Sequence, residues 1–404
     1  MHNRFSPLRD FLHRESSSGV LLLGASGAGI AIANSPLSAH YFNILSEGFQ
    51  FDFGFIFLKL SVLKIINYVL MTLFFFVVGL EIKREMTTGH LATFRNAIMP
   101  FLGALGGMAF PAAIYLLIAG DSHPRGWGVP VATDIALAVG LLGMIGSSVA
   151  PSLRTFLLGL AVIDDIGAIL IIAFIYSEGV GLIWVLGAAA VVVTIVLLQK
   201  LGLRRTSVYI LLGVILWYML YRSGIHATLS GVILGLLTPN IPKDDRVVKL
   251  SDGHKVTVVE WLEERLHPWT TYLIVPIFAF ANTGVVISSQ SIREAFYSPI
   301  AWGIFFGLVI GKPLGVALTV VSAKKIGVGD FPTGATQRGL IGTGSAAGIG
   351  FTVAIFIADL AFNNKSDQDL AIIAVIIASF ISGLLSLIIF TSRKQETFET
   401  DSIL

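Results

Sequence analysis

Long apolar stretches recur along almost the whole chain, and they constrain its fold more than any other feature. A helix needs about 20 apolar residues to cross a bilayer, and it satisfies its own backbone hydrogen bonds in lipid. The pattern therefore predicts an all-α polytopic membrane protein with twelve transmembrane helices, which forms one domain over residues 1–404. The apolar segments are 16–33, 57–81, 97–119, 127–146, 155–176, 181–198, 206–220, 224–237, 269–288, 299–322, 338–361 and 369–391.

The composition agrees with a protein whose solvent is the lipid bilayer. Hydrophobic residues make up 55% of the chain and charged residues only 13%, about half the share that is usual in soluble proteins. The 27 basic and 25 acidic residues give a net charge of +2, which provides no basic excess for binding nucleic acid. Because the chain has no cysteine, disulfides, thiolate metal sites and thiol nucleophiles are excluded.

Residues 206–237 can be divided into two short helices or joined into one long helix, and this choice sets the orientation of every later loop. The rule that cytoplasmic loops carry the excess of lysine and arginine decides between them. Two helices and a cytoplasmic N-terminus place 20 of these residues inside and 4 outside, whereas one helix gives 12 and 11. We therefore expect both termini in the cytoplasm.

Phenylalanines alternate with other residues between the first two apolar segments, at Phe49, Phe51, Phe53, Phe55 and Phe57. A period of two is typical of a β-strand, and aromatic residues also collect at membrane interfaces. Two interpretations stay open: an interfacial aromatic belt, or a periplasmic β-hairpin at about 45–58 that pairs across a dimer.

Four charged residues within apolar segments are the candidates for a buried functional site: Asp134, Asp164, Asp165 and Lys312. Each costs about 2.5–3.5 kcal/mol at mid-membrane on insertion scales and needs a partner, a cavity or a function. Two adjacent carboxylates with little water do not both ionise easily, and their hard oxygens suit a small hard cation. Asp164 and Asp165 thus predict a site that holds either protons or a cation; the structural alternative is a salt-bridged pair that packs two helices.

Two of the apolar segments contain residues that interrupt helices. Pro130 lies within 127–146, and the segment 338–361 contains five glycines. Interrupted segments in the two halves of a transporter indicate discontinuous helices at a midplane site. Asp134 would offset the positive N-terminal ends of such helices and Lys312 the negative C-terminal ends. For the glycines, close helix packing is an equal alternative.

Several motifs together resemble those of the bacterial NhaA-type sodium/proton antiporters, over nearly the whole chain. They are Val78-Gly79-Leu80-Glu81-Ile82-Lys83-Arg84-Glu85, Ala132-Thr133-Asp134-Ile135-Ala136, Gly159-Leu160-Ala161-Val162-Ile163-Asp164-Asp165-Ile166-Gly167-Ala168, Phe278-Ala279-Phe280-Ala281-Asn282 and Gly311-Lys312-Pro313-Leu314-Gly315. The double aspartate in its apolar context is the most specific of them.

The resemblance implies an arrangement in which helices 3–5 and 10–12 form inverted repeats and the discontinuous helices 4 and 11 cross. By match of motif, Asp165 is expected to be the principal cation carboxylate, and Asp164 the partner that pairs with Lys312 when the cation is absent. Thr133 and Asp134 are expected beside the helix break. The family's cytoplasmic pH-response region is expected at Glu81, Arg84, Glu85, Glu263 and His267.

The expected function is electrogenic, secondary-active exchange of Na⁺, and of Li⁺, for H⁺ across the bacterial cell inner membrane, which regulates intracellular pH and sodium. We expect a homodimer, no cofactor and no enzymatic activity. Two rivals come from other classes: an ungated ion channel, and an intramembrane aspartyl protease suggested by Gly327-Val328-Gly329-Asp330. The protease would need a Tyr-Asp pair for its second catalytic carboxylate, and the sequence has none.

Overall fold

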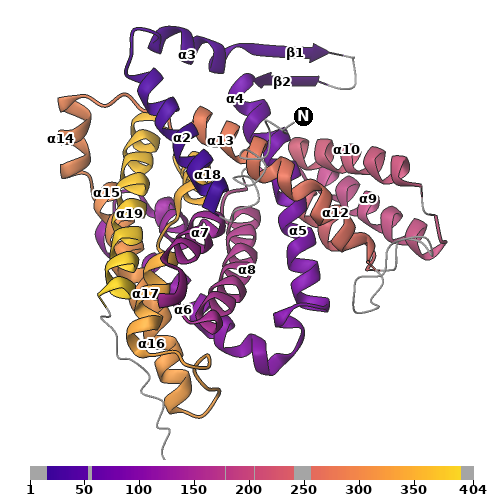
Figure 1. Cartoon of the computed structure of the whole chain (residues 1–404). Helices are drawn as coiled ribbons and strands as arrows, with labels where there is room; N and C mark the ends of the chain where they lie inside the picture. The colour runs from indigo at the N-terminus through magenta and orange to yellow at the C-terminus, as the bar shows by residue number, and fades with distance from the viewer. Residues whose placement is uncertain (1–15, 53–56, 178, 204, 241–255, 393–404) are drawn as a thin grey trace, which may run out of the picture.

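A computed structural model describes residues 16–52, 57–177, 179–203, 205–240 and 256–392 of the chain. It is helical apart from one β-hairpin (Figure 1). The first half contains α2 (Ser16–Ala33), α3 (Ser38–Ser46), α4 (Val62–Ile65), α5 (Met71–Thr87), α6 (Phe94–Ala119), α7 (Ile135–Ile145), α8 (Pro151–Phe174), α9 (Leu182–Lys200), α10 (Thr206–Ser223) and α11 (Leu229–Leu237). The second half contains α12 (Val258–Trp269), α13 (Val275–Asn282), α14 (Ser289–Tyr297), α15 (Pro299–Phe306), α16 (Lys312–Lys325), α17 (Gln337–Ala347), α18 (Phe351–Ala361) and α19 (Lys365–Thr391).

Short segments of other helix types join these elements. Three are 3₁₀ turns, η2 (His90–Ala92), η3 (Pro124–Val131) and η4 (Gly146–Ser148). Three are π-helical, η1 (Ile66–Leu70), η5 (Thr270–Ile274) and η6 (Gly307–Gly311). π-Helical turns often mark functional positions; η1 contains the buried Asn67, and η6 directly precedes Lys312.

The described residues contain 8 helices that are long and apolar enough to cross a membrane, or up to 10 if each of two bent pairs counts as one span. The chain is therefore a polytopic membrane protein. Twelve spans were predicted from the sequence, and the difference lies in two segments. Helix α11 has 9 residues, less than half of the length that a bilayer requires. Helix α13 continues α12 and η5 without interruption over residues 258–282, and the α12 part of this helix is rich in charged residues.

An antiparallel hairpin follows α3 at one end of the molecule (Figure 1). It pairs β1 (Gly48–Asp52) with β2 (Phe57–Ser61), and Phe49 lies opposite Leu60. The second strand corrects the expectation of a helical segment that begins at residue 57. The helix starts at Val62 instead, where the Ser61 hydroxyl accepts a hydrogen bond from the Lys64 amide at 3.2 Å. Phe53 and Phe55 lie outside the described residues.

The hairpin gives the molecule two distinguishable ends. We call the end that carries β1, β2 and α3 the hairpin face, and the end at which α5 and α16 finish the opposite face (Figure 1). Helix α5 runs from the hairpin face to the opposite face, and α18 runs back toward the hairpin face.

The structure divides residues 206–237 into two helices, as the distribution of basic residues predicts. Helix α10 ends at Ser223, and Gly224 follows with φ 81°. Only glycine adopts this left-handed backbone conformation without steric cost, and it is the usual way to end a helix. The chain then turns, and α11 begins at Leu229.

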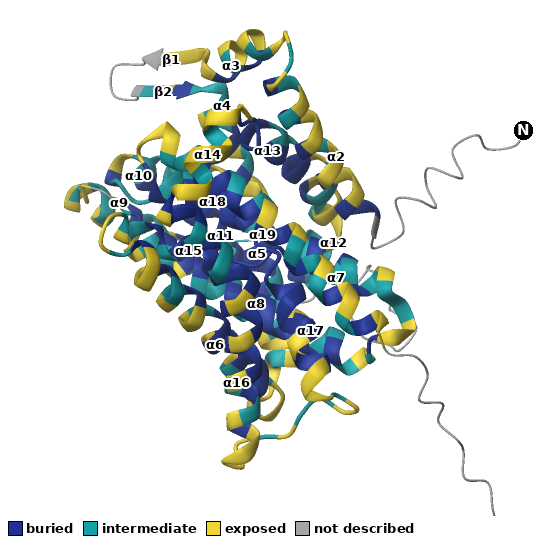
Figure 2. Ribbon diagram, turned by 90° about the vertical axis from the view of Figure 1, so that its left-hand side faces the viewer, coloured by how far each residue is buried: buried dark blue, intermediate teal, exposed yellow. Residues whose placement is uncertain are grey.

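Buried residues concentrate in the centre of the molecule, on α5, α8 and α18 (Figure 2). Leu157 and Leu160 of α8 and Phe356 of α18 are fully buried. The outer helices α9 and α10 expose large apolar side chains instead, and Ile183 and Ile210 are 77% and 63% exposed. Apolar surfaces of this extent are typical of a face that contacts lipid.

Candidate functional site

The first break in a helix lies between η3 and α7. Pro130 falls in the last turn of η3, and the backbone is extended at Ala132 and at Asp134. The Asp134 side chain then begins α7 by accepting a hydrogen bond from the Leu137 amide at 3.1 Å. An aspartate at this position satisfies an amide that would otherwise lack a partner, so the break has a defined geometry.

The second break lies between α17 and α18, whose axes differ by 51°. Residues 348–350 join the two helices, and the backbones of neighbouring elements approach closely there. A side chain at Gly348 would place its Cβ 2.6 Å from the Leu308 carbonyl oxygen and 2.9 Å from Ser382 Oγ. Only glycine fits at this position. The glycines here therefore agree with both interpretations of the sequence, because the helix is interrupted and neighbouring backbones pack closely at the same place.

The two breaks bond directly to each other. The Asp134 amide donates to the Ile349 carbonyl at 2.6 Å, and the Thr133 hydroxyl donates to the Ala347 carbonyl at 2.8 Å. In the other direction, the Thr352 hydroxyl and amide donate to Asp134 Oδ2 at 2.6 and 3.1 Å. The Asp134 carboxylate therefore lies at the N-terminal ends of both α7 and α18, where a negative charge is stabilised.

Asp164 and Lys312 form an ion pair beside this crossing. Both side chains are fully buried, and the Lys312 ammonium contacts Asp164 Oδ2 and the Val131 carbonyl at the end of η3. The Thr133 hydroxyl donates to the same Asp164 oxygen at 2.6 Å, whereas Asp164 Oδ1 is buried without a hydrogen-bond partner. Lys312 begins α16 directly after the π-helical turn η6.

Asp165 has a different environment from its neighbour. Successive helical residues point about 100° apart, and the Asp165 carboxylate makes no hydrogen bond or ion pair with any described residue. Glu81 of α5, Asp164 and Asp134 are the carboxylates whose charges act on it. The two neighbouring carboxylates thus differ: Asp164 is held by Lys312 and Thr133, and Asp165 is not bonded to any described residue.

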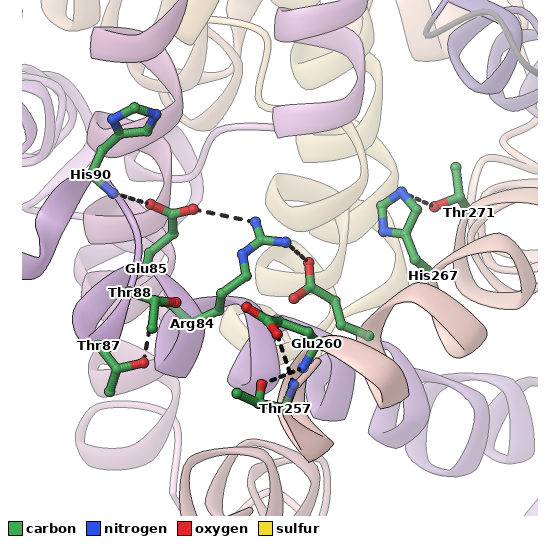
Figure 3. Close-up of polar contacts among 10 residues, drawn as sticks. Arg84, Glu85, Thr87, Thr88, His90, Thr257, Glu260, His267 and Thr271 are labelled. Carbon is green, nitrogen blue, oxygen red and sulfur yellow. Dashed lines mark hydrogen bonds and ion pairs between the residues drawn. The ribbon is translucent and has the colours of Figure 1, made fainter. Parts of the chain in front are cut away.

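A second set of charged residues joins the C-terminal end of α5 to the middle of α12 (Figure 3). The Arg84 guanidinium contacts Glu263 Oε1 at 2.5 Å and Glu85 Oε1 at 3.2 Å. Glu85 also accepts a hydrogen bond from the His90 amide at 3.0 Å. The structure thus brings Arg84, Glu85 and Glu263 together.

Glu263 is the member of this set whose ionisation responds near neutral pH. Burial raises the pKa of Glu263 from its usual value of 4.5 to about 7, against the opposing effect of the Arg84 charge. Below about pH 7 the side chain is protonated, and above it the charged pair with Arg84 is complete. His267 lies one turn further along α12 and contacts the Thr271 hydroxyl at 3.3 Å; burial lowers the pKa of His267.

Three polar residues near the hairpin face were missed in the sequence: Asn67, Asn282 and Asp359. Asn282 appears only as the end of an apolar motif, and Asp359 lies two residues before the end of segment 338–361, where a charge is easily assigned to the interface. The structure bonds the three together. The carbonyls of Val131, Ala347 and Ile349 were also missed, since backbone groups leave no signal in the sequence.

A family model described as Na⁺/H⁺ antiporter 1 matches residues 9–390 of the chain. The chain belongs to the NhaA family of Na⁺/H⁺ antiporters. It is 40% identical over 386 residues to the Na⁺/H⁺ antiporter NhaA 2 of Clostridium beijerinckii, which covers 95% of this chain and 94% of the relative. The NhaA of Shewanella sp. is 41% identical over 382 residues, covering 94% and 95% of the two chains.

The NhaA assignment confirms the resemblance that the sequence motifs indicate. A solved structure, that of the sodium proton antiporter NhaP1 of Methanocaldococcus jannaschii at pH 8, aligns with a TM-score of 0.53 and 14% identity. The alignment covers 93% of this chain and 90% of that chain, and it supports the fold alone. As a member of the NhaA family the chain is a membrane transporter, not an enzyme, and Na⁺ and H⁺ are the ions that it exchanges. The protease and channel hypotheses are therefore wrong.

Proposed function

We propose that this NhaA-family chain is an electrogenic antiporter that expels Na⁺ and Li⁺ from the cytoplasm in exchange for entering protons. It acts in the bacterial cell inner membrane and regulates intracellular pH and sodium. One observation carries the proposal: Asp164 and Asp165 are adjacent at the crossing of two broken helices, with Lys312 as the paired cation. Two carboxylates and one lysine amine hold exchangeable protons in a buried place, where a small cation competes with those protons for the same oxygens.

The oxygens at the crossing support competition between Na⁺ and protons. Asp164 Oδ1 has no hydrogen-bond partner, and the Asp165 carboxylate is unbonded among the described residues. Carboxylate oxygens are the ligands that small hard cations prefer. When Na⁺ binds, Asp165 releases its proton and Asp164 leaves Lys312 to become a ligand; when protons return, Na⁺ is displaced.

The ion pair also bears on the second proton of the cycle. A carboxylate that is already paired with an ammonium holds no proton to release, so the pair of Asp164 with Lys312 favours Lys312 as the carrier. Asp165 supplies the other proton. Two positive charges then enter for each Na⁺ that leaves, which makes the exchange electrogenic. The alternative, in which Asp164 carries the second proton, gives the same charge balance, and the current carried by a Lys312→Gln variant distinguishes the two.

The order of helices supports alternating access in a twelve-helix fold with inverted repeats. Helices 3–5 correspond to α6, then η3 with α7, then α8. Helices 10–12 correspond to α15 with α16, then α17 with α18, then α19. In both triplets the middle member is the broken helix, as expected for repeats that place a transport site at their interface. The bundle that carries Asp164 and Asp165 moves relative to the rest and exposes the site to each side in turn.

Glu263 supports the assignment of a pH-response region on the cytoplasmic side. Its pKa of about 7 means that the pair with Arg84 changes its charge in the physiological range. Glu85 is joined to the same guanidinium, and Glu81 lies on α5 between this region and Asp165. His267 completes the set on α12. The hairpin supports a homodimer, because an edge strand offers unpaired backbone groups to a second copy.

Transport assays on the Asp165→Asn variant test the proposal. Na⁺ is added to everted membrane vesicles that hold a preformed proton gradient, and the collapse of the gradient is recorded. The variant should show no Na⁺-driven proton movement, because an amide neither holds an exchangeable proton nor balances the charge of Na⁺. Glu294→Gln serves as control, since this carboxylate of α14 bonds only the Gln290 side chain of its own helix. Exchange at the normal rate in Asp165→Asn would refute the site.

A further inference from the structure

One face of α18 connects the crossing to the hairpin face. Thr352, Phe356 and Asp359 are four and three residues apart, so their side chains lie on the same side of the helix. Thr352 bonds Asp134 at the crossing. Phe356 is fully buried, and Asp359 lies in the last turn of the helix. A polar group therefore occurs at each end of this face, with an aromatic ring between them.

The outer end of this face is a polar cluster from three elements, which we call the outer polar site: Asn67 of η1, Asn282 of α13 and Asp359 of α18. The Asn67 amide group donates to Asn282 Oδ1 at 3.0 Å and to Asp359 Oδ2 at 3.1 Å. Asn282 donates back to Asn67 Oδ1 at 2.9 Å and to the Phe278 carbonyl at 2.9 Å. Asn67 is 3% exposed and Asn282 is 9% exposed.

Packing alone does not account for a charged residue at position 359. The two asparagines satisfy each other, and any neutral acceptor would take the remaining hydrogen of Asn67. A buried carboxylate costs free energy unless it is paired, and no described cation lies within ion-pair distance of Asp359. The nearest candidate on α19, Lys365, contacts Asp369 at 2.9 Å instead. The carboxylate is thus largely buried without an ion pair: the Gln368 amide donates to Asp359 Oδ1 at 3.5 Å, and Lys365 and Lys64 act on the charge only from beyond ion-pair distance.

A cavity joins the outer polar site to the surface. It has a volume of about 100 Å³, and Asn282, Asp359, Lys365 and Gln368 contribute polar groups to its lining. The Lys365 side chain is 61% exposed at the start of α19, so the cavity reaches the hairpin face. A space of this size with polar walls holds several water molecules, and an ion in it keeps part of its hydration.

An aromatic barrier separates the outer polar site from the crossing. The Phe356 ring lies 5.5 Å from the Phe75 ring and 6.0 Å from the Phe278 ring, measured between centroids. All three side chains are at most 4% exposed. Neither water nor an ion passes through packed rings, so the path between the cavity and Asp164 is closed in this structure.

We propose that the outer polar site is a transit site for monovalent cations, at which H⁺ and Na⁺ pause between the hairpin face and the Asp164/Asp165 site. The Asp359 carboxylate attracts the cation and the amide oxygens of Asn67 and Asn282 complete its ligands, while Phe356 closes the inner side. This inference rests on the proposed function, because it takes Asp164 and Asp165 as the place of exchange.

Kinetics measured from each face test the transit site. Membrane vesicles of both orientations carry the wild type, Asp359→Asn, Asp359→Glu or the control Glu294→Gln. Asp359→Asn keeps an acceptor for Asn67 and should raise the apparent KM for Na⁺ about tenfold when Na⁺ is presented at the hairpin face. The KM at the opposite face should change less than about twofold on the same scale. Asp359→Glu should recover most of the affinity, and Glu294→Gln should match the wild type.

The outcomes separate this inference from the proposed function. An equal effect of Asp359→Asn at both faces, or no effect at either, overturns the transit site and leaves the Asp164/Asp165 site standing. Exchange by Asp165→Asn overturns the proposed function itself. A rise in KM confined to the hairpin face, with Asp165→Asn inactive, supports both.

Thiol labelling provides a second test that does not depend on transport. The chain has no cysteine, so a single introduced thiol is the only one that reacts. With a membrane-impermeant methanethiosulfonate cation at the hairpin face, Asp359→Cys should react at least about tenfold faster than Phe356→Cys, since a tenfold ratio needs only about 1.4 kcal/mol. Each variant is first shown to be folded by size-exclusion chromatography. Equal rates, or labelling of Asp359→Cys from the opposite face only, would overturn the proposal.

Discussion

Replacing Lys312 with glutamine removes one partner of a fully buried ion pair. The Lys312 and Asp164 side chains are both 0% exposed, and the ammonium also bonds the Val131 carbonyl. Removing one partner of such a pair leaves an uncompensated charge in the interior, which destabilises a protein by about 3–5 kcal/mol. We therefore expect Lys312→Gln to be less stable than the wild type by an amount in this range at alkaline pH.

The loss should depend on pH, because Asp164 escapes the uncompensated charge by holding a proton. The variant should approach wild-type stability as the pH falls, and the difference should grow as the pH rises. Unfolding in detergent, followed by intrinsic fluorescence over a pH series, measures both effects. Lys325→Gln is the matched control, since this lysine is in the last turn of the same helix and is exposed. Wild-type stability of Lys312→Gln at alkaline pH would refute the energetic role of the pair.

Further predictions concern the cycle, its pH dependence and the assembly. If Lys312 carries the second proton, Lys312→Gln should exchange without net charge, whereas currents on proteoliposomes would persist if Asp164 carries it. Acid should raise the apparent KM for Na⁺ because protons compete for the same oxygens; a change in the maximal rate alone would contradict this. Glu263→Gln should remove the transition near pH 7 that the raised pKa of Glu263 predicts, and an unmoved pH profile in a variant that still transports would exclude the role. Deletion of residues 48–55 should give monomers that still exchange ions, as native mass spectrometry and vesicle assays can show; unchanged dimers would return the phenylalanines to an interfacial belt.

The sequence predicts most of the helices well, because the free energy of transferring apolar side chains from water to lipid determines where they form. The segment 16–33 coincides with α2 (Ser16–Ala33), and Pro130 marks the first break. The charged residues within apolar segments also indicate a buried site, because each must be compensated. The pairing of Asp164 with Lys312 was available only through the family resemblance, since no local pattern joins residues 148 positions apart.

Other features depend on tertiary contacts that leave little trace in the sequence. Asp359 is adjacent to the end of an apolar run, and only the fold brings it to Asn67, 292 positions away. The π-helical turn before Lys312 has an ordinary apolar sequence, Gly307–Gly311. The phenylalanine alternation is equally compatible with a strand and with an aromatic belt, and the choice depends on pairing with Leu58 and Leu60.

The crosswise bonds between the two broken helices also restrict how this chain evolves. Asp134 comes from the first half of the chain and Thr352 from the second, and each satisfies backbone or side-chain groups of the other's helix. A substitution on one side alone leaves a buried polar group without its partner, so neutral drift at these positions must proceed by paired changes. The residues of the two halves that bond at this crossing are therefore expected to change together, although they lie far apart in the sequence. Recombination between distant relatives succeeds only when both positions come from the same parent or from parents that match there.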